Sequence, residues 1–391
     1  MKTALLFRLG GLGDYLILTC VAKELKKRGY EVDACFGSPT ADPEAIVGNL
    51  GIFRKIYKYG RVMTGLDVYE TEDGDNASTE LLKDGYDLVV DYKLSIELNS
   101  HYRHLSNSPG KEWMVSQNSN YMNWMDMMFA WAGIDPTEIA DEDKIPSYKV
   151  EDKENEWAKN LLRATNADKV IALQTNASSL VRTWYHPDRL PKAIKEAYGD
   201  KGKRRIDFVV FDGNQWQLLR GQFVVPVSVP AGINPMRASA ALLANSDLFI
   251  GADSGLSHLA EAIGIKSLTI YTTVPAWTRM RYYKHAKAIE PIGKVFNDVS
   301  CRPCFVLDRY CPRVREKASG ELSPREAHIK GAMEAGKNPA EVAKELNTTI
   351  QGILMEGDLM QKRLNALYEV QAPCTMTITP DRIVEAIKEF M

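Results

Sequence analysis

The stretch from Asp247 to Thr273, DLFIGADSGLSHLAEAIGIKSLTIYTT, restricts the fold more than any other part of the sequence. Its apolar run at 248–250 predicts a buried strand, and the SHLAEAI segment after it has the spacing of an amphipathic helix. A second apolar run at 267–271 then completes one βαβ unit of a parallel sheet. In open α/β sheets the turn between strand and helix binds ligands, because the free N–H groups and the dipole of the helix attract an anion.

Four residues lie on that turn or one helical turn after it: Asp253, Ser254, Gly255 and His258. Because helical side chains tilt toward the N-terminus, we expect His258 to face back toward the helix start. One interpretation is that the residues bind the phosphates of a nucleotide. The other is that Asp253 or Ser254 caps the helix and His258 is a core histidine. Their convergence on one helix start favours the nucleotide-phosphate site.

The alternation of strands and helices continues through both halves of the chain. We expect strands at 3–9, 30–36, 52–57 and 86–91, then at 170–174, 206–211 and 223–229, and helices at 15–28, 43–50, 188–198 and 235–245. Such alternation predicts parallel βαβ units in a doubly wound sheet. The fold class is therefore predicted as α/β, with two Rossmann-like domains whose parallel sheets face a cleft. A polar loop is expected at 65–78, and a helix over the cleft or beside the domain junction within 113–131.

Shifts in composition suggest where the domains begin and end. The acidic, helix-poor segment 135–144 is a candidate linker. It separates an N-terminal domain at 1–145 from a C-terminal domain at 146–311. Residues 312–372 break the pattern, since they are helical in character, charged and without strands, and a terminal helix is expected within 373–391.

The segment 312–372 contains AMEAGKNPAEVAKELNTTI, which resembles a helix-turn-helix with a proline-started helix. This pattern raises the alternative that the insertion contacts DNA. The candidate recognition helix at 348–356 carries no Lys or Arg, however, which favours packing or contact with another partner.

Composition restricts the class of protein. The 391 residues are 45% hydrophobic and 26% charged, as in ordinary soluble domains. The net charge of −2 gives no bulk attraction to nucleic acid or membranes. No apolar run approaches the ~20 residues that a membrane span needs, and the apolar part of the N-terminus is too short for a signal peptide. We therefore expect a cytoplasmic protein without a transmembrane segment, whose cysteines are mostly reduced unless they hold a metal.

A second glycine-rich turn, GGLGD at 10–14, follows the first expected strand and opens a helix. Gly11 and Gly13 would let the backbone approach a phosphate or sugar closely. The turn is not GxGxxG and lacks the Lys of a P-loop, so a nicotinamide site is only weakly supported. Asp14 has two interpretations that its position leaves open: an acid stabilised by the helix dipole, or a general base for an acceptor hydroxyl.

The loop QTNASSLVRTWYHPDR at 174–189 also joins a strand end to a helix. Thr175 and Arg182 have side chains suited to diphosphate oxygens, Arg182 through charge-assisted hydrogen bonds. A polar loop with a solvated arginine is the alternative.

Taken together, LFRLGGLGD, RTWYHP and DSGLSHLAEA resemble the heptosyltransferase-type glycosyltransferases, the ADP-heptose:lipopolysaccharide heptosyltransferase family. The resemblance covers residues 1–300 and the final helix. It implies a GT-B fold in which the C-terminal domain holds the nucleotide-sugar donor and the N-terminal domain the acceptor. It also implies an inverting, metal-independent reaction that requires no cofactor.

The resemblance further assigns roles to single residues. Asp14 matches the catalytic base proposed for the family, and Thr175 and Arg182 match its donor-phosphate loop, where the family usually has Lys. Asp253, Ser254, Gly255 and His258 match its Asp-Thr-Gly-x-x-His donor site, with Ser in place of Thr. The sequence departs from the family at Thr19 and Cys20, where a Pro is common, and in the insertion, so the acceptor stays open.

Four cysteines follow the donor motif: Cys301, Cys304, Cys311 and Cys374. A C-x₂-C pair with two later thiols is compatible with a tetrahedral structural zinc site. Packed thiols are an equal alternative, and a disulfide is disfavoured in the cytoplasm.

The sequence thus predicts a glycosyltransferase that uses a nucleotide-diphosphate sugar. Asp14 would accept the proton of the attacking hydroxyl, while Arg182, the turn at 253–255 and His258 would stabilise the leaving nucleotide diphosphate. The acceptor would be a bacterial surface glycan or, through the insertion, hydroxyl-modified DNA as in bacteriophage enzymes. A non-catalytic nucleotide-sugar or DNA-binding protein and a GT-B-like sugar epimerase are further alternatives. The base and sugar of the donor are read by loop shape, which the sequence does not reveal.

Overall fold

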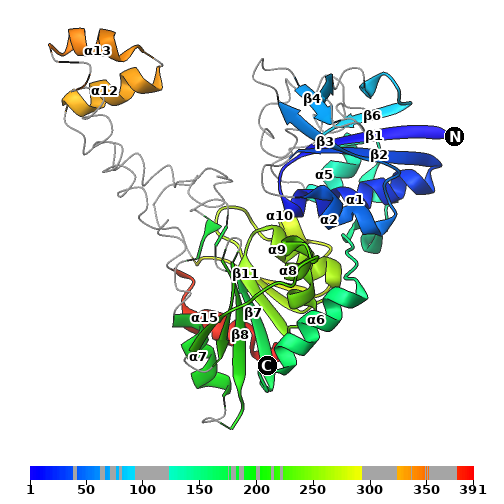
Figure 1. Cartoon of the computed structure of the whole chain (residues 1–391), viewed down its shortest axis with the longest axis vertical. Helices are drawn as coiled ribbons and strands as arrows, with labels where there is room; N and C mark the ends of the chain where they lie inside the picture. Colours follow the sequence, from blue (N-terminus) through cyan, green and yellow to red (C-terminus); the bar gives the residue numbers. More distant parts are fainter. Residues whose placement is uncertain are drawn as a thin grey trace.

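The computed structural model contains two α/β domains joined by a short connecting segment (Figure 1). The residues that it describes are 1–37, 42–61, 67–70, 76–78, 82–92, 123–174, 176–177, 182–184, 189–199, 203–212, 215–220, 223–292, 324–335, 337–347, 349, 351 and 377–391.

The N-terminal domain is built on a six-stranded sheet of order β5-β4-β3-β2-β1-β6. Strands β1 (Lys2–Leu9), β2 (Tyr30–Gly37), β3 (Ile56–Arg61) and β6 (Leu88–Asp91) are parallel, and β4 (Asp67–Glu70) and β5 (Asn76–Ser78) extend the sheet in antiparallel fashion. The helices of this domain are α1 (Leu12–Lys27), α2 (Pro43–Val47), the 3₁₀ turn η1 (Gly48–Leu50) and α5 (Trp124–Trp131).

The C-terminal domain holds a seven-stranded sheet of order β10-β9-β8-β7-β11-β12-β13. Its parallel strands are β7 (Lys169–Gln174), β8 (Ile206–Asp212), β11 (Leu248–Ala252), β12 (Ser267–Ile270) and β13 (Ala286–Ile289), and its antiparallel edge is β9 (Gln215–Arg220) and β10 (Phe223–Pro226). Its helices are α6 (Asp152–Arg163), α7 (Arg189–Tyr198), α8 (Pro235–Ala244), α9 (Gly255–Ile263) and the short α10 (Trp277–Met280).

These sheets confirm the predicted α/β class with two Rossmann-like domains, as in GT-B proteins. Other details of the prediction were wrong. The polar stretch at 65–78 contains strands β4 and β5, because antiparallel edge strands need no buried apolar run. Strand β3 begins at Ile56 rather than 52, and β9, β13 and α10 were not predicted. The acidic segment 135–144 contains only two 3₁₀ turns, η4 (Pro136–Glu138) and η5 (Asp141–Lys144).

One hydrophobic cluster runs through both domains. It includes Leu6 and Leu16 on the N-terminal side and Phe249 and Leu259 on the C-terminal side. Helices α1 and α9, which come from different domains, make the main contact across the junction. A buried pair reinforces it, since Arg237 of α8 binds Glu154 at 2.6 and 2.8 Å and donates to the carbonyl of Ala45 in the N-terminal domain at 3.2 Å. The two helix starts that bear the candidate residues are therefore packed together.

Near the C-terminus the described residues form α12 (Pro324–Glu334), α13 (Pro339–Glu345), α15 (Pro380–Ala386) and the 3₁₀ turn η9 (Lys388–Phe390). The first two pack against each other, and α15 packs against α7 (Figure 1). Trp184 anchors the terminal segment, because its indole N–H donates to the carbonyl of Ile378 at 2.7 Å. Most of the candidate recognition helix at 348–356 lies outside the described residues, so the helix-turn-helix stays a prediction.

Candidate functional site

In each sheet the strand order reverses beside the candidate residues, and at each reversal a hydrogen bond of a polar side chain joins the two strand ends. In the N-terminal sheet the order reverses between β1 and β6, where Arg8 donates from Nη1 to the carbonyl of Tyr92 at 2.8 Å. In the C-terminal sheet it reverses between β7 and β11, where the Ser254 hydroxyl donates to Oε1 of Gln174 at 2.5 Å. Ligands of open α/β sheets bind at the carboxyl ends of the strands beside such reversals.

At the start of α1, Asp14 is held by two donors. The N–H of Gly11 donates to its Oδ2 at 2.8 Å, and the fully buried guanidinium of Arg8 forms an ion pair with its Oδ1. The backbone of Gly10 has a φ of +139°, and a Cβ there would collide with the Asp14 carboxylate. The Asp14 carboxylate thus caps the start of α1, and 21% of its side chain is still exposed. Each carboxylate oxygen has two lone pairs, so Asp14 retains capacity for a further donor.

At the start of α9, Asp253 is 3% exposed and lies beside Arg182. Nη1 of Arg182 donates to the backbone carbonyl of Asp253 at 2.9 Å and lies 3.8 Å from its Oδ2. Among the residues that the structure describes, no group makes a hydrogen bond to Oδ2, although this atom is buried. A buried carboxylate oxygen without a hydrogen-bond donor is costly, so it indicates a place where a ligand completes the bonding.

Glycines allow the two helix starts to approach each other. A Cβ on Gly13 would lie 2.6 Å from Cδ2 of His258, and a Cβ on Gly255 would lie 2.8 Å from Cβ of Leu12. Real Cβ atoms do not tolerate such contacts, so only glycine fits at either position. Of the two glycines that the sequence suggested as ligand-approach residues, Gly13 lies at the contact between α1 and α9, whereas a Cβ on Gly11 would meet nothing within 4 Å.

His258 is a buried, neutral imidazole. Burial lowers its pKa to about 4; the charge of Asp253 opposes this shift, and that of Arg279 adds to it. Its Nδ1 lies 2.5 Å from the hydroxyl of Tyr283, and the two rings meet edge to face. Burial also raises the pKa of Tyr283 well above its ordinary value, so the phenol stays protonated. A Tyr283 hydroxyl that donates to Nδ1 leaves the proton on Nε2, where the ring offers a donor.

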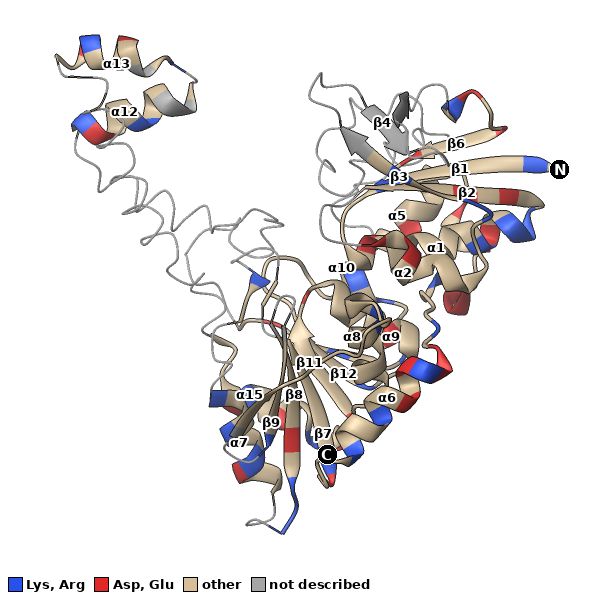
Figure 2. Ribbon diagram, viewed as in Figure 1, with Lys and Arg blue, Asp and Glu red and all other residues tan. Residues whose placement is uncertain are grey.

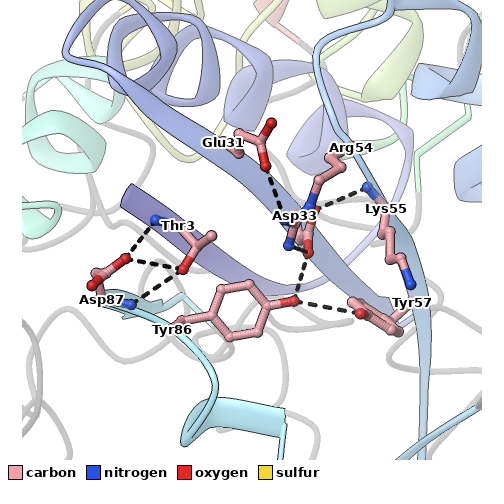
Figure 3. Close-up of polar contacts among 8 residues, drawn as sticks. All are labelled: Thr3, Glu31, Asp33, Arg54, Lys55, Tyr57, Tyr86 and Asp87. Atoms are coloured by element: carbon pink, nitrogen blue, oxygen red, sulfur yellow. Dashed lines mark hydrogen bonds and ion pairs between the residues drawn. The ribbon is translucent and has the colours of Figure 1, made fainter. Parts of the chain in front are cut away.

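Asp33, a buried carboxylate of the N-terminal domain, provides a comparison for Asp253. Asp33 is fully buried and accepts from Arg54 at 2.9 and 2.6 Å, from the Lys55 N–H at 3.0 Å and from the Tyr86 hydroxyl at 2.6 Å (Figure 3). Its neighbours extend the network through Glu31 and Tyr57. Asp33 therefore has the complete bonding of a structural carboxylate, which Oδ2 of Asp253 lacks.

The structure brings together most of the residues predicted from the sequence: Gly11, Gly13, Asp14, Arg182, Asp253, Ser254, Gly255 and His258. Thr175 lies outside the described residues, as do Cys301, Cys304, Cys311 and Cys374. Four further residues at the site were not predicted from the sequence: Arg8, Gln174, Arg279 and Tyr283. Arg8 had a detectable signal, because a charged residue within the apolar run LLFRL requires a carboxylate partner once it is buried.

Among the described residues, no three His, Cys, Asp or Glu side chains are grouped as metal ligands would be. Likewise, none of the helices in these parts of the chain combines the length and apolar character needed to cross a membrane.

Comparison with known proteins locates a family similarity on the site itself. Residues 230–309 match the model of glycosyltransferase family 9 (heptosyltransferase), a range that includes Asp253, Ser254, Gly255 and His258. The predicted resemblance is therefore confirmed, and the chain is heptosyltransferase-like over this segment. No curated protein matches the sequence.

Three solved structures show the following similarity to this chain. ADP-heptose lps heptosyltransferase II of E. coli is 12% identical, with a TM-score of 0.49, over 78% of this chain and 96% of the other. The glycosyl transferase family 9 protein of Veillonella parvula is 13% identical, with a TM-score of 0.48, over 74% and 85%. TibC, described as a bacterial iron-containing dodecameric glycosyltransferase from enterotoxigenic E. coli, is 16% identical, with a TM-score of 0.44, over 80% and 69%.

Proposed function

We propose that this chain is a glycosyltransferase that moves a sugar from a nucleotide-diphosphate donor to an acceptor hydroxyl with inversion. The observation that carries the proposal is the packing of α1 on α9, in which Gly13, the residue before Asp14, lies against His258 of the other domain and the charge of Asp14 acts on His258. The site has a carboxylate from the N-terminal domain and an arginine and a helix start from the C-terminal domain. Each domain thus offers groups for one of the two substrates of a transferase.

The C-terminal side would hold the donor. The start of α9 presents backbone N–H groups and the positive end of a helix dipole, and Arg182 lies next to it. Neutral His258 would donate from Nε2 to a sugar or phosphate oxygen without adding charge. These groups would stabilise the diphosphate as negative charge develops on the leaving oxygen.

The reaction would be a direct displacement. The acceptor oxygen forms a bond with the anomeric carbon while the bond from that carbon to the diphosphate oxygen breaks, and the diphosphate leaves with the electron pair. The proton of the acceptor hydroxyl passes to Asp14. Because attack and departure occur on opposite faces of the sugar, the anomeric configuration inverts.

The division of labour between domains follows from this chemistry. Residues 1–145 would bind the acceptor and residues 146–311 the donor, with 312–372 as an insertion and 373–391 as a terminal segment. The family match supports a heptose-type donor and a glycan acceptor. Helices α12 and α13 carry charges of both signs (Figure 2), so the described part of the insertion gives no support to nucleic acid as the acceptor.

One observation favours a second candidate, a protein that binds nucleotide sugars without turnover. Both oxygens of Asp14 are already engaged, by Gly11 and by Arg8. A carboxylate held in this way acts as a cap and an ion-pair partner even if it never accepts a proton.

A thermal-shift panel tests the donor site. Nucleoside diphosphates and nucleotide sugars of different bases are added to the wild-type chain and to Asp253→Asn. The proposal expects that one base raises the Tm of the wild-type chain and that the variant loses this shift, because ligands stabilise the state that binds them. If no nucleotide raised the wild-type Tm, both candidate functions would be wrong.

A further inference from the structure

Arg279 is a buried cation whose bonding is incomplete. Its side chain is on α10 and is 5% exposed, yet Nε and Nη1 are buried without a hydrogen-bond partner, as judged within the part of the chain that the structure describes. The guanidinium lies over the ring of Trp124, which belongs to α5 of the N-terminal domain. Stacking on a ring occupies the face of a guanidinium, whereas its N–H donors point outward along its edge. The contact with Trp124 therefore satisfies neither Nε nor Nη1, and no other described residue accepts from them.

The nearby carboxylates are already paired with other groups. Asp14 is paired with Arg8, and Asp253 lies against Arg182. A third carboxylate at this end of the domain, Glu290, accepts from the N–H of Ala276 at 2.9 Å. Burial lowers the pKa of Arg279 to about 9, and the charge of Asp253 only partly offsets this effect. Arg279 is thus a buried cation at neutral pH that forms no ion pair with a carboxylate of the described residues.

We propose that Arg279 binds a phosphoryl oxygen of the donor diphosphate and completes the anion site begun by Arg182 and the start of α9. This inference rests on the proposed function. A guanidinium offers two parallel N–H donors that match the oxygens of a phosphate. Arg279 is placed for this role because its charge lowers the pKa of His258 and interacts with Asp253 and Arg182.

The position of Arg279 also connects the donor to the domain junction. Trp124 supports the guanidinium from the N-terminal domain, and next to it Asn123 donates from Nδ2 to the carbonyl of Trp277 at 2.9 Å. The diphosphate would therefore be held by a cation whose orientation depends on the other domain. This arrangement makes donor binding sensitive to Trp124, although that residue need not touch the ligand.

The test compares Arg279→Met with the matched control Arg281→Gln, which removes an exposed arginine two residues further on. For each variant, the Tm without ligand and the dissociation constants of the nucleoside diphosphate and of the uncharged nucleoside are measured. For Arg279→Met we expect diphosphate affinity to fall about tenfold to a hundredfold, as for loss of a charge-assisted hydrogen bond. The nucleoside affinity of Arg279→Met should change less than about twofold. For Arg281→Gln, both dissociation constants should change less than about twofold, and the Tm should stay that of the wild type.

The unliganded Tm provides an independent readout. Because an unpaired buried charge is unfavourable, its replacement by an apolar side chain of similar length should leave the Tm unchanged or raise it. A lower Tm with unchanged diphosphate affinity would mean that Arg279 only pairs with Asp253 or braces Trp124, and would overturn the inference. If the wild-type chain bound no diphosphate at all, the proposed function itself would fail, which is a different result.

Discussion

Gly13 and His258 belong to different domains, and a Cβ on Gly13 would lie 2.6 Å from Cδ2 of the His258 ring. The contact is possible only because Gly13 has no side chain. It fixes the start of α1 against the start of α9 and holds Asp14 at the edge of the donor motif. The distance between Asp14, the candidate base, and the candidate donor site thus depends on the absence of a Cβ at Gly13.

Substitution Gly13→Ala should therefore disturb both stability and donor binding. Overpacking of a close contact costs about 1–3 kcal/mol, and the displaced His258 should weaken donor binding by about tenfold. The matched control is Gly11→Ala, since a Cβ on Gly11 would meet nothing within 4 Å. Urea unfolding and donor titration measure the two effects. Equal unfolding free energies for the two variants would show that the helix starts are not packed as described.

Asp253 and Asp33 should respond in opposite ways to replacement by Asn. Asp33→Asn breaks a complete network with Arg54 and Tyr86, and we expect a loss of about 2–4 kcal/mol of unfolding free energy with donor affinity retained. Asp253→Asn changes a carboxylate with one unbonded oxygen, and we expect a smaller loss of stability but no donor binding. Unfolding and titration of both variants are the measurements. Retained donor binding in Asp253→Asn would remove this residue from the site.

The depressed pKa of His258 predicts a specific pH dependence of stability. In the folded protein this pKa is about 4, against an ordinary value of 6.5. Between these values the unfolded chain binds more protons than the folded chain, so stability falls as pH decreases from 6.5 to 4. The contribution amounts to about 3 kcal/mol at most. Well above pH 6.5 the ring is neutral in both states and contributes nothing to the slope.

The measurement is the difference in unfolding free energy between the wild-type chain and His258→Gln at pH 4.5 and pH 7. We expect the variant to lose less stability than the wild type on acidification. Identical slopes in wild type and His258→Gln would contradict burial of a neutral ring.

Tyr283 should act as a positioning residue for His258. Substitution Tyr283→Phe removes the hydroxyl that lies 2.5 Å from Nδ1, so the proton is no longer confined to Nε2. We expect donor affinity to fall about threefold to tenfold, and the pH profile of turnover to shift as His258 titrates differently. Tyr282→Phe is the matched control, because that hydroxyl bonds to Asp126 at 2.7 Å, away from His258. If Tyr283→Phe lowered stability but left the pH profile of turnover unchanged, Tyr283 would have only a structural role.

Much of the fold could be predicted from the sequence, since buried parallel strands such as 248–250 and 170–174 are continuous apolar runs bounded by turns. The antiparallel strands β4 and β9 were missed because antiparallel strands can face water on one side, so they need not be continuous apolar runs. Short α10 has no periodicity to detect.

The site was predictable where residues follow one another on a strand-to-helix turn, as at 10–14 and 253–258. Contacts between site residues that lie far apart in the sequence could not be predicted. Tyr283 reaches His258 only through the folding of the C-terminal domain, and Arg279 reaches Trp124 only through the packing of the two domains. Nothing in the segment WTRMRYY indicates these partners. Likewise, the close approach of Gly13 to His258 depends on an interface between domains, for which local sequence provides no signal.

The most direct test of the account is the release of nucleoside diphosphate from the donor by the wild-type chain and by Asp14→Asn, each with donor affinity measured alongside. Because this substitution also leaves the buried Arg8 without its carboxylate, turnover is compared only at temperatures where both proteins are folded. The account predicts that Asp14→Asn binds the donor within about threefold of wild type and that transfer falls about a hundredfold or more, as for loss of a general base. Wild-type turnover in Asp14→Asn, or tight donor binding without any turnover by the wild-type chain, would contradict it.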